Sequence, residues 1–193
     1  MPQVKREIGI VSYPMARTQL IAARGPWTSR PLPESPTRSR PDDDTRSTST
    51  GKHPVIGFVS TYPPTECGIA TFTAALRMAM AGGRTSGDDL PVVSLVHKPL
   101  QVPAPEVVYQ HMVGDPDSLV SAVELLNKMD AVVIQHEYGI YGGPDGDEIL
   151  DLVASLRVPV LVVLHTVPRL PTPRQRTILE TLIKESDEAV VLS

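Results

Sequence analysis

The 193-residue sequence lacks several features that mark specialised classes of protein. Its single cysteine, Cys67, excludes a disulfide within the chain, and no Cys/His cluster has the spacing of a zinc site. No apolar run approaches the roughly 20 residues that cross a bilayer, and the N-terminus has no signal-peptide core. A formal net charge of −4 gives no electrostatic reason for a nucleic-acid partner. These absences favour a cytoplasmic protein in a reducing compartment.

Three common enzyme motifs are also absent. The sequence contains neither GxGxxG, which binds dinucleotides, nor GxxxxGK[ST], which binds nucleoside triphosphates. It has no GxSxG nucleophile elbow. A stand-alone hydrolase is an alternative function, with Cys67 or the pair His136 and Glu137 as its reactive groups. The absence of the nucleophile elbow counts against it.

Residues 1–53 differ in composition from the rest of the chain. Pro, Ser, Thr and Arg dominate between Pro26 and Thr50. A segment of this kind buries too little apolar surface to offset the entropy lost when it becomes ordered. The sequence therefore predicts a disordered leader over residues 1–53.

From Val55 onward, apolar strand-like runs alternate with amphipathic helical stretches. The first helical stretch is predicted over residues 68–81. Continuous apolar strands that alternate with helices indicate a parallel sheet covered on both faces. We therefore expect one doubly wound α/β domain over residues 54–193. The predicted strands are 55–60, 91–96, 106–110, 131–135, 158–164 and 189–192.

Capping patterns mark where the later helices begin. Asp115 and Pro116 suit the N-cap and the first position of a helix. Asp145 with Glu148, and Thr172 with Gln175, have the spacing of capping boxes. The first helix is expected to bury one apolar face, made of Ile69, Phe72, Leu76, Ala79 and Met80.

Polar residues collect where three predicted strands end. They lie in the loops 61–68, 136–143 and 165–169. Parallel sheets of this type bind ligands beyond the carboxyl ends of their strands. The sequence therefore predicts that these three loops form one site.

The residue types in these loops suit a sugar phosphate. Gly68 opens a helix whose N-terminal amides favour an anion, although a glycine that only satisfies a turn is the alternative. His136 and His165 each end an apolar strand, and an imidazole hydrogen-bonds sugar hydroxyls or a leaving phosphate. Glu137 suits a hydroxyl or a general base. The alternatives are structural histidines, a solvated carboxylate or a helix-terminus partner for Glu137 and, for Cys67, a small residue that fills a tight turn.

Four runs of residues together resemble the bacterial family-four glycosyltransferases, a group that includes many mannosyl- and glucosyltransferases. The resemblance covers about residues 54–193. It implies the Rossmann-like N-terminal half of a GT-B fold, in which two such domains face each other across a cleft. The runs are STYPPTECGIATFT (Ser60–Thr73), VVIQHEYGIYGGPDG (Val132–Gly146), VLVVLHTVPRLPTPRQR (Val160–Arg176) and SDEAVVLS (Ser186–Ser193).

The resemblance implies a donor side and a catalytic residue. Gly68 and Ile69 would approach the diphosphate of a nucleotide-sugar. His165 would contact the transferred sugar or its phosphate. Transfer of a hexosyl group, mannose or glucose, with retention of configuration is expected, with no cofactor and no metal ion.

The resemblance also implies an acceptor side, lined by His136, Glu137 and Tyr138. The acceptor would be a sugar or a lipid, and peripheral contact with a membrane is compatible with it. Because no residue follows Ser193, we expect the donor domain to be missing or to lie on a separate chain, and this chain to be inactive alone. The alternative function is a non-catalytic module or regulatory partner that binds a sugar phosphate or a nucleotide-sugar.

Overall fold

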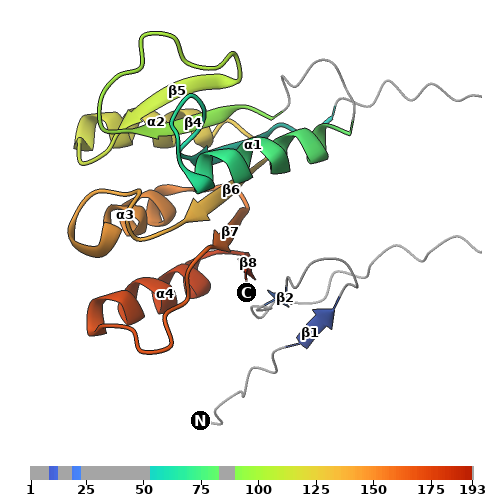
Figure 1. Cartoon of the computed structure of the whole chain (residues 1–193), viewed down its shortest axis with the longest axis vertical. Helices are drawn as coiled ribbons and strands as arrows, with labels where there is room; N and C mark the ends of the chain where they lie inside the picture. Colours follow the sequence, from blue (N-terminus) through green and yellow to red (C-terminus); the bar gives the residue numbers. More distant parts are fainter. Residues whose placement is uncertain (1–8, 13–18, 23–52, 83–89, 193) are drawn as a thin grey trace, which may run out of the picture.

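A six-stranded parallel sheet forms the centre of the computed structural model, which describes residues 9–12, 19–22, 53–82 and 90–192 (Figure 1). Its strand order is β5-β4-β3-β6-β7-β8, and every neighbouring pair is parallel. The predicted Rossmann-like α/β fold is therefore confirmed. The strands are β3 (Ile56–Ser60), β4 (Val92–Val96), β5 (Val107–Met112), β6 (Ala131–His136), β7 (Val160–Leu164) and β8 (Glu188–Val191).

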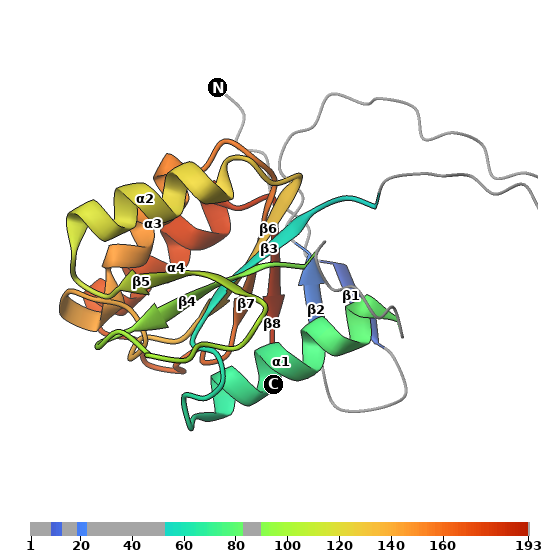
Figure 2. The ribbon, with the colours of Figure 1, turned by 90° about the horizontal axis from the view of Figure 1, so that it is seen from above.

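Helices cover both faces of this sheet, in unequal number. One face packs against a single helix, α1, and the other packs against α2, α3 and α4 (Figure 2). In the part of the chain that the structure describes, no helix is both long enough and apolar enough to cross a membrane. The helical elements are α1 (Gly68–Ala81), α2 (Pro116–Leu126), α3 (Glu148–Ser155), α4 (Pro173–Glu185) and the short 3₁₀ turn η1 (Pro144–Gly146).

The pleat of each strand sends alternate side chains into two separate cores. In β6, Ile134 packs on the side of α2, α3 and α4, whereas Val133 packs on the side of α1. In β7, Val162 and Val163 divide in the same way. The position of a residue in this alternation therefore decides which face of the sheet its side chain occupies.

Two short strands lie within the segment predicted as a leader. β1 (Gly9–Ser12) and β2 (Gln19–Ala22) pair antiparallel and form a separate two-stranded sheet. β2 lies beside β8 in both views (Figures 1 and 2). Residues 1–8, 13–18 and 23–52 of the predicted leader, and residues 83–89 after α1, lie outside the described residues.

Two of the predicted helix starts are confirmed. The Asp115 carboxylate accepts hydrogen bonds from the amides of Asp117 and Ser118 at 3.0 and 3.3 Å. Thr172 and Gln175 form a reciprocal capping box, with bonds of 3.1 and 3.0 Å. Local sequence therefore determines where α2 and α4 begin.

Two local predictions are wrong. Asp145 and Glu148 do not form a capping box, because Glu148 is the first residue of α3 and its carboxylate binds elsewhere. Ala79 and Met80 are exposed and do not belong to the buried face of α1. Arg77 is buried instead, because Leu90 O accepts from its Nε at 2.7 Å and Glu106 pairs with its guanidinium at 3.1 Å. Arg77 therefore lies on the buried side of α1, where Ala79 and Met80 were expected.

Candidate functional site

The predicted loops meet where the strand order of the sheet reverses. From β3 the chain continues through α1 to β4 on one side, and from β6 it continues through α3 to β7 on the other. The loops 61–67 and 137–143 therefore diverge from neighbouring strands, and the loop after β7 lies next to them. Open α/β sheets bind ligands at such a switch point.

The N-terminus of α1 presents two free amides at this edge. The Cys67 sulfur caps the helix, accepting from Ala70 N at 3.3 Å, and lies 3.1 Å from Thr61 Oγ1. Within the described chain, the backbone N–H groups of Gly68 and Ile69 have no acceptor. A Cβ added at Gly68 would meet nothing within 4 Å. This open helix end suits an anion, and the Cys67 thiol is used as a cap rather than paired with a histidine.

His165 lies on the α1 side of the sheet, immediately after β7. Its Nε2 is 2.7 Å from Gln135 Oε1, and the Phe72 ring packs edge-on against it with centroids 4.9 Å apart. Burial lowers the pKa of His165, and the nearby Glu137 carboxylate opposes this shift only in part. Its Nδ1 has no partner among the described residues and is not among the buried atoms. The half-buried ring is therefore neutral near pH 7, with one nitrogen open to a ligand.

Glu137 connects the two loops that flank His165. Its Oε2 accepts from Thr166 Oγ1 at 2.5 Å, and its Oε1 accepts from Tyr138 N at 3.1 Å. Both carboxylate oxygens are therefore engaged. In this conformation Glu137 holds the loops after β6 and β7 together.

His136 is fully buried at the end of β6, and neither ring nitrogen has a hydrogen-bond partner in the described structure. The Tyr138 ring packs edge-on at 4.9 Å, and the Tyr141 ring stacks at 6.4 Å between centroids. Burial lowers the pKa of His136 to about 4; Glu137 opposes the shift and His165 adds to it. The Tyr138 hydroxyl is also buried without a partner, and burial raises its pKa.

The candidate residues share one edge of the sheet but occupy two faces. His165 N donates to His136 O at 3.0 Å, so the two backbones are adjacent. The His136 ring nevertheless packs with Tyr138 and Tyr141 on the face of α2, α3 and α4. Gly68, Ile69 and His165 lie on the α1 side. The structure therefore places the predicted phosphate and catalytic positions on one side of the sheet and the His136 ring on the other.

The role of Gln135, which is fully buried and contacts His165, was not predictable from the sequence patterns. The available signal was a polar residue at the end of an otherwise apolar strand. Its importance depends on a partner 30 positions away in the chain. Local patterns do not identify such a partner.

A second missed residue, Glu148, connects three elements at the same edge. Its carboxylate accepts from Gly114 N at 2.9 Å and from Gly142 N at 2.8 Å, and lies 3.2 Å from His111 Nε2. His111 is buried and its other nitrogen is 3.1 Å from Ser118 Oγ. The Ser118–His111–Glu148 chain is closed to solvent at its serine and histidine, so we assign it a structural role.

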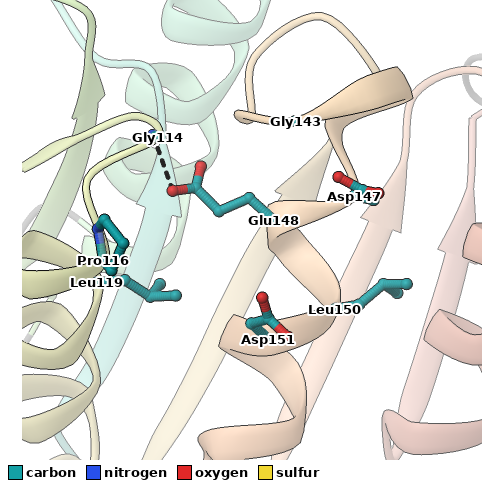
Figure 3. Close-up of a pocket in the computed structure, with 8 residues that line it drawn as sticks. All are labelled: Gly114, Pro116, Leu119, Gly143, Asp147, Glu148, Leu150 and Asp151. Carbon is teal, nitrogen blue, oxygen red and sulfur yellow. Dashed lines mark hydrogen bonds between the residues drawn. The ribbon is translucent and has the colours of Figure 1, made fainter.

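A cavity of about 410 Å³ opens between the N-terminal ends of α2 and α3 (Figure 3). It contains none of the predicted site residues. In the described ranges, no group of three or more His, Cys, Asp or Glu residues is arranged to hold a metal ion. The lining residues are Gly114, Pro116, Leu119, Gly143, Asp147, Glu148, Leu150 and Asp151.

Comparison with known proteins yields no relative: no family model matches the chain, and no curated protein or solved structure matches it.

Proposed function

We propose that this chain is the acceptor-side half of a retaining glycosyltransferase. Together with a donor-binding domain, it transfers a hexosyl group, mannose or glucose, from a nucleotide-sugar to a sugar or lipid acceptor. The four sequence runs support this assignment. The parallel sheet, with its candidate loops at the switch point, is compatible with it.

One observation supports a sugar-phosphate ligand most directly. The unpaired amides of Gly68 and Ile69 are hydrogen-bond donors, and the open Nδ1 of neutral His165 is an acceptor. Phe72, one helical turn after Gly68, packs on His165 and brings the two groups to the same side of the sheet. A sugar phosphate needs donors for its phosphate oxygens and acceptors for its hydroxyls.

In the proposed reaction, the α1 N-terminus stabilises the negative charge that develops on the leaving diphosphate. His165 orients the transferred sugar. The Glu137 carboxylate accepts a hydrogen bond from a hydroxyl of the glycosyl acceptor. One of its oxygens becomes available for this bond when Thr166 Oγ1 or Tyr138 N releases it. His136 and Tyr138 reach an acceptor only after the loop 137–143 moves, because the His136 ring is fully buried.

Calorimetry with the full chain tests the binding half of the proposal. With a donor-binding domain added, a guanosine or uridine diphosphate hexose should bind saturably, and His165→Ala should weaken this binding about tenfold or more. His97→Ala is the matched control, because His97 is an exposed histidine directly after a strand. Absence of binding by every nucleotide-sugar and simple hexoside tested would contradict the proposal.

A transfer assay tests the catalytic half. Labelled hexose should reach an acceptor only when a donor-binding domain is added to the chain. Turnover by this chain without an added domain would contradict the division into two halves. Binding that never leads to turnover, even with the added domain, would instead favour a non-catalytic binding module.

A further inference from the structure

We infer that Gln135 is a positioning residue: it makes Nδ1 of His165 a hydrogen-bond acceptor, so that His165 binds a sugar hydroxyl rather than a phosphate oxygen. The assignment of the His165 proton to Nε2 depends only on the bond between His165 and Gln135 and on the packing around it. The identity of the ligand as a sugar rests on the proposed function. The family resemblance leaves open whether His165 contacts the sugar or its phosphate, and the bond from His165 to Gln135 favours the sugar.

The proton on His165 is located by its bond to Gln135. The two atoms in contact, His165 Nε2 and Gln135 Oε1, are 2.7 Å apart. The Gln135 amide turns its oxygen, not its nitrogen, toward the ring, and an amide oxygen only accepts hydrogen bonds, so this orientation places the hydrogen on Nε2. In a neutral imidazole the other nitrogen, Nδ1, then carries a lone pair.

Packing holds both partners of this bond in place. Gln135 is fully buried, and its backbone oxygen accepts from the Tyr141 hydroxyl at 2.7 Å. It pairs with Val163 in the register of β6 and β7. The Phe72 ring lies at 86° to the imidazole plane and restricts its rotation. Gln135 therefore acts on a ligand through His165 and does not touch the ligand itself.

The lone pair on Nδ1 determines which ligand atom it binds. A hydroxyl can donate to Nδ1, whereas an ionised phosphate oxygen is itself an acceptor and is repelled. The phosphate instead finds donors at the amides of Gly68 and Ile69, which have no acceptor within the described chain. The two ends of a sugar phosphate are thereby assigned to different parts of the site.

Nuclear magnetic resonance of the ¹⁵N-labelled full chain near pH 7 tests the positioning, because the two histidine tautomers have different nitrogen shifts. We expect protonated Nε2 and unprotonated Nδ1 in the wild type. Gln135→Met, of similar volume, should give a mixture of tautomers, and Gln135→Glu should restore the proton on Nε2 because it restores an oxygen acceptor. Gln110→Met is the matched control, since the Gln110 amide binds only the Leu100 backbone.

Either of two results would overturn the positioning: a proton on Nδ1 in the wild type, or an unchanged tautomer in Gln135→Met. A thermal melt of each variant establishes that it is folded. If Gln135→Met does not fold, the wild-type tautomer and the Gln135→Glu spectrum still decide the question.

Two ligand titrations test the selectivity. A methyl hexoside should shift the Nδ1 signal of His165, and sulfate, a fully ionised stand-in for phosphate oxygens, should shift the amide signals of Gly68 and Ile69 without moving Nδ1. Gln135→Met should weaken hexoside binding about tenfold, the size expected for loss of one oriented hydrogen bond. Sulfate that shifts Nδ1 would overturn the selectivity. If neither ligand binds and the tautomer is as expected, the proposed function fails while the positioning of His165 stands.

Discussion

Two histidines end neighbouring strands of the same sheet, and their surroundings differ. His165 is half-buried, bonded to Gln135 through one nitrogen and open to ligands through the other. His136 is fully buried between Tyr138 and Tyr141, and both of its nitrogens are unpartnered in the described structure. Similar local sequence, an apolar strand followed by histidine, therefore gives one accessible group and one sealed group.

The difference arises from a shift of one residue in register. His136 pairs with Leu164, so His165 lies one residue further along its strand. Successive side chains of a strand point to opposite faces, and the two rings therefore separate although their backbones are hydrogen-bonded. Accessibility at a strand end thus depends on alternation relative to the neighbouring strand as well as on residue type.

The largest expected effect concerns the acid sensitivity of His136. Its pKa is lowered to about 4 in the folded chain, against 6.5 for an ordinary histidine. Between these values the unfolded chain binds a proton that the folded chain does not, so the free energy of unfolding falls as the pH is lowered from 6.5 to 4. We expect His136 to account for a loss of about 3 kcal/mol, measured by urea unfolding across this range.

His136→Leu isolates this contribution from that of other titrating groups. The variant should flatten the pH profile and be at least as stable as the wild type near pH 7, because two unpartnered nitrogens are removed. His97→Gln, at an exposed position, should keep the wild-type profile. Full acid sensitivity in His136→Leu would show that the ring is not sealed as described.

A pair of glycine variants compares the surroundings of the two histidines. Gly146 lies against Tyr138, which packs on His136, and Gly68 begins the helix whose Phe72 packs on His165. Gly146 has φ +73° and a Cβ there would collide with Tyr138 O, so Gly146→Ala should destabilise by about 2 kcal/mol. Gly68→Ala meets no neighbour within 4 Å and should change stability by about 0.5 kcal/mol or less. Thermal or urea unfolding measures both. Equal effects of the two substitutions would contradict the contrast between a packed loop and an open one.

A pair of tyrosine variants tests which hydroxyl contributes to the packing around His136. The Tyr141 hydroxyl donates to Gln135 O at 2.7 Å, so Tyr141→Phe should cost about 1 kcal/mol. The Tyr138 hydroxyl is buried without a partner, so Tyr138→Phe should be neutral or slightly stabilising. Denaturant unfolding at pH 7 distinguishes them, and the reverse order of effects would contradict the hydrogen bonding described here.

The smallest expected effect is on the His165 side, at the cap of α1. Cys67→Ser replaces a sulfur acceptor with an oxygen at the N-cap and should change the free energy of unfolding by about 0.5 kcal/mol or less. Nucleotide-sugar binding should be unchanged, as calorimetry would show. Loss of binding in Cys67→Ser would indicate a role for the sulfur beyond capping.

The fold and part of the site were predictable because they depend on short-range patterns. Alternating apolar runs predicted the parallel sheet, and the cap at Asp115 and the capping box at Thr172 predicted two helix starts. The predictions for the buried face of α1 and for Glu148 failed. In both cases a distant polar partner decided the outcome: Glu106 for Arg77, and the amides of Gly114 and Gly142 for Glu148.

By itself, the sequence determined the succession of strands and helices along the chain and the three polar loops at one edge of the sheet. Strand periodicity and helix capping involve only a few neighbouring residues, so they can be recognised in the sequence. Only the tertiary structure decided that His165 is hydrogen-bonded to Gln135. It also decided that His136 is buried against Tyr138 and Tyr141. Register between strands depends on contacts between residues far apart in the chain, and a shift of one position exchanges the two faces of a sheet.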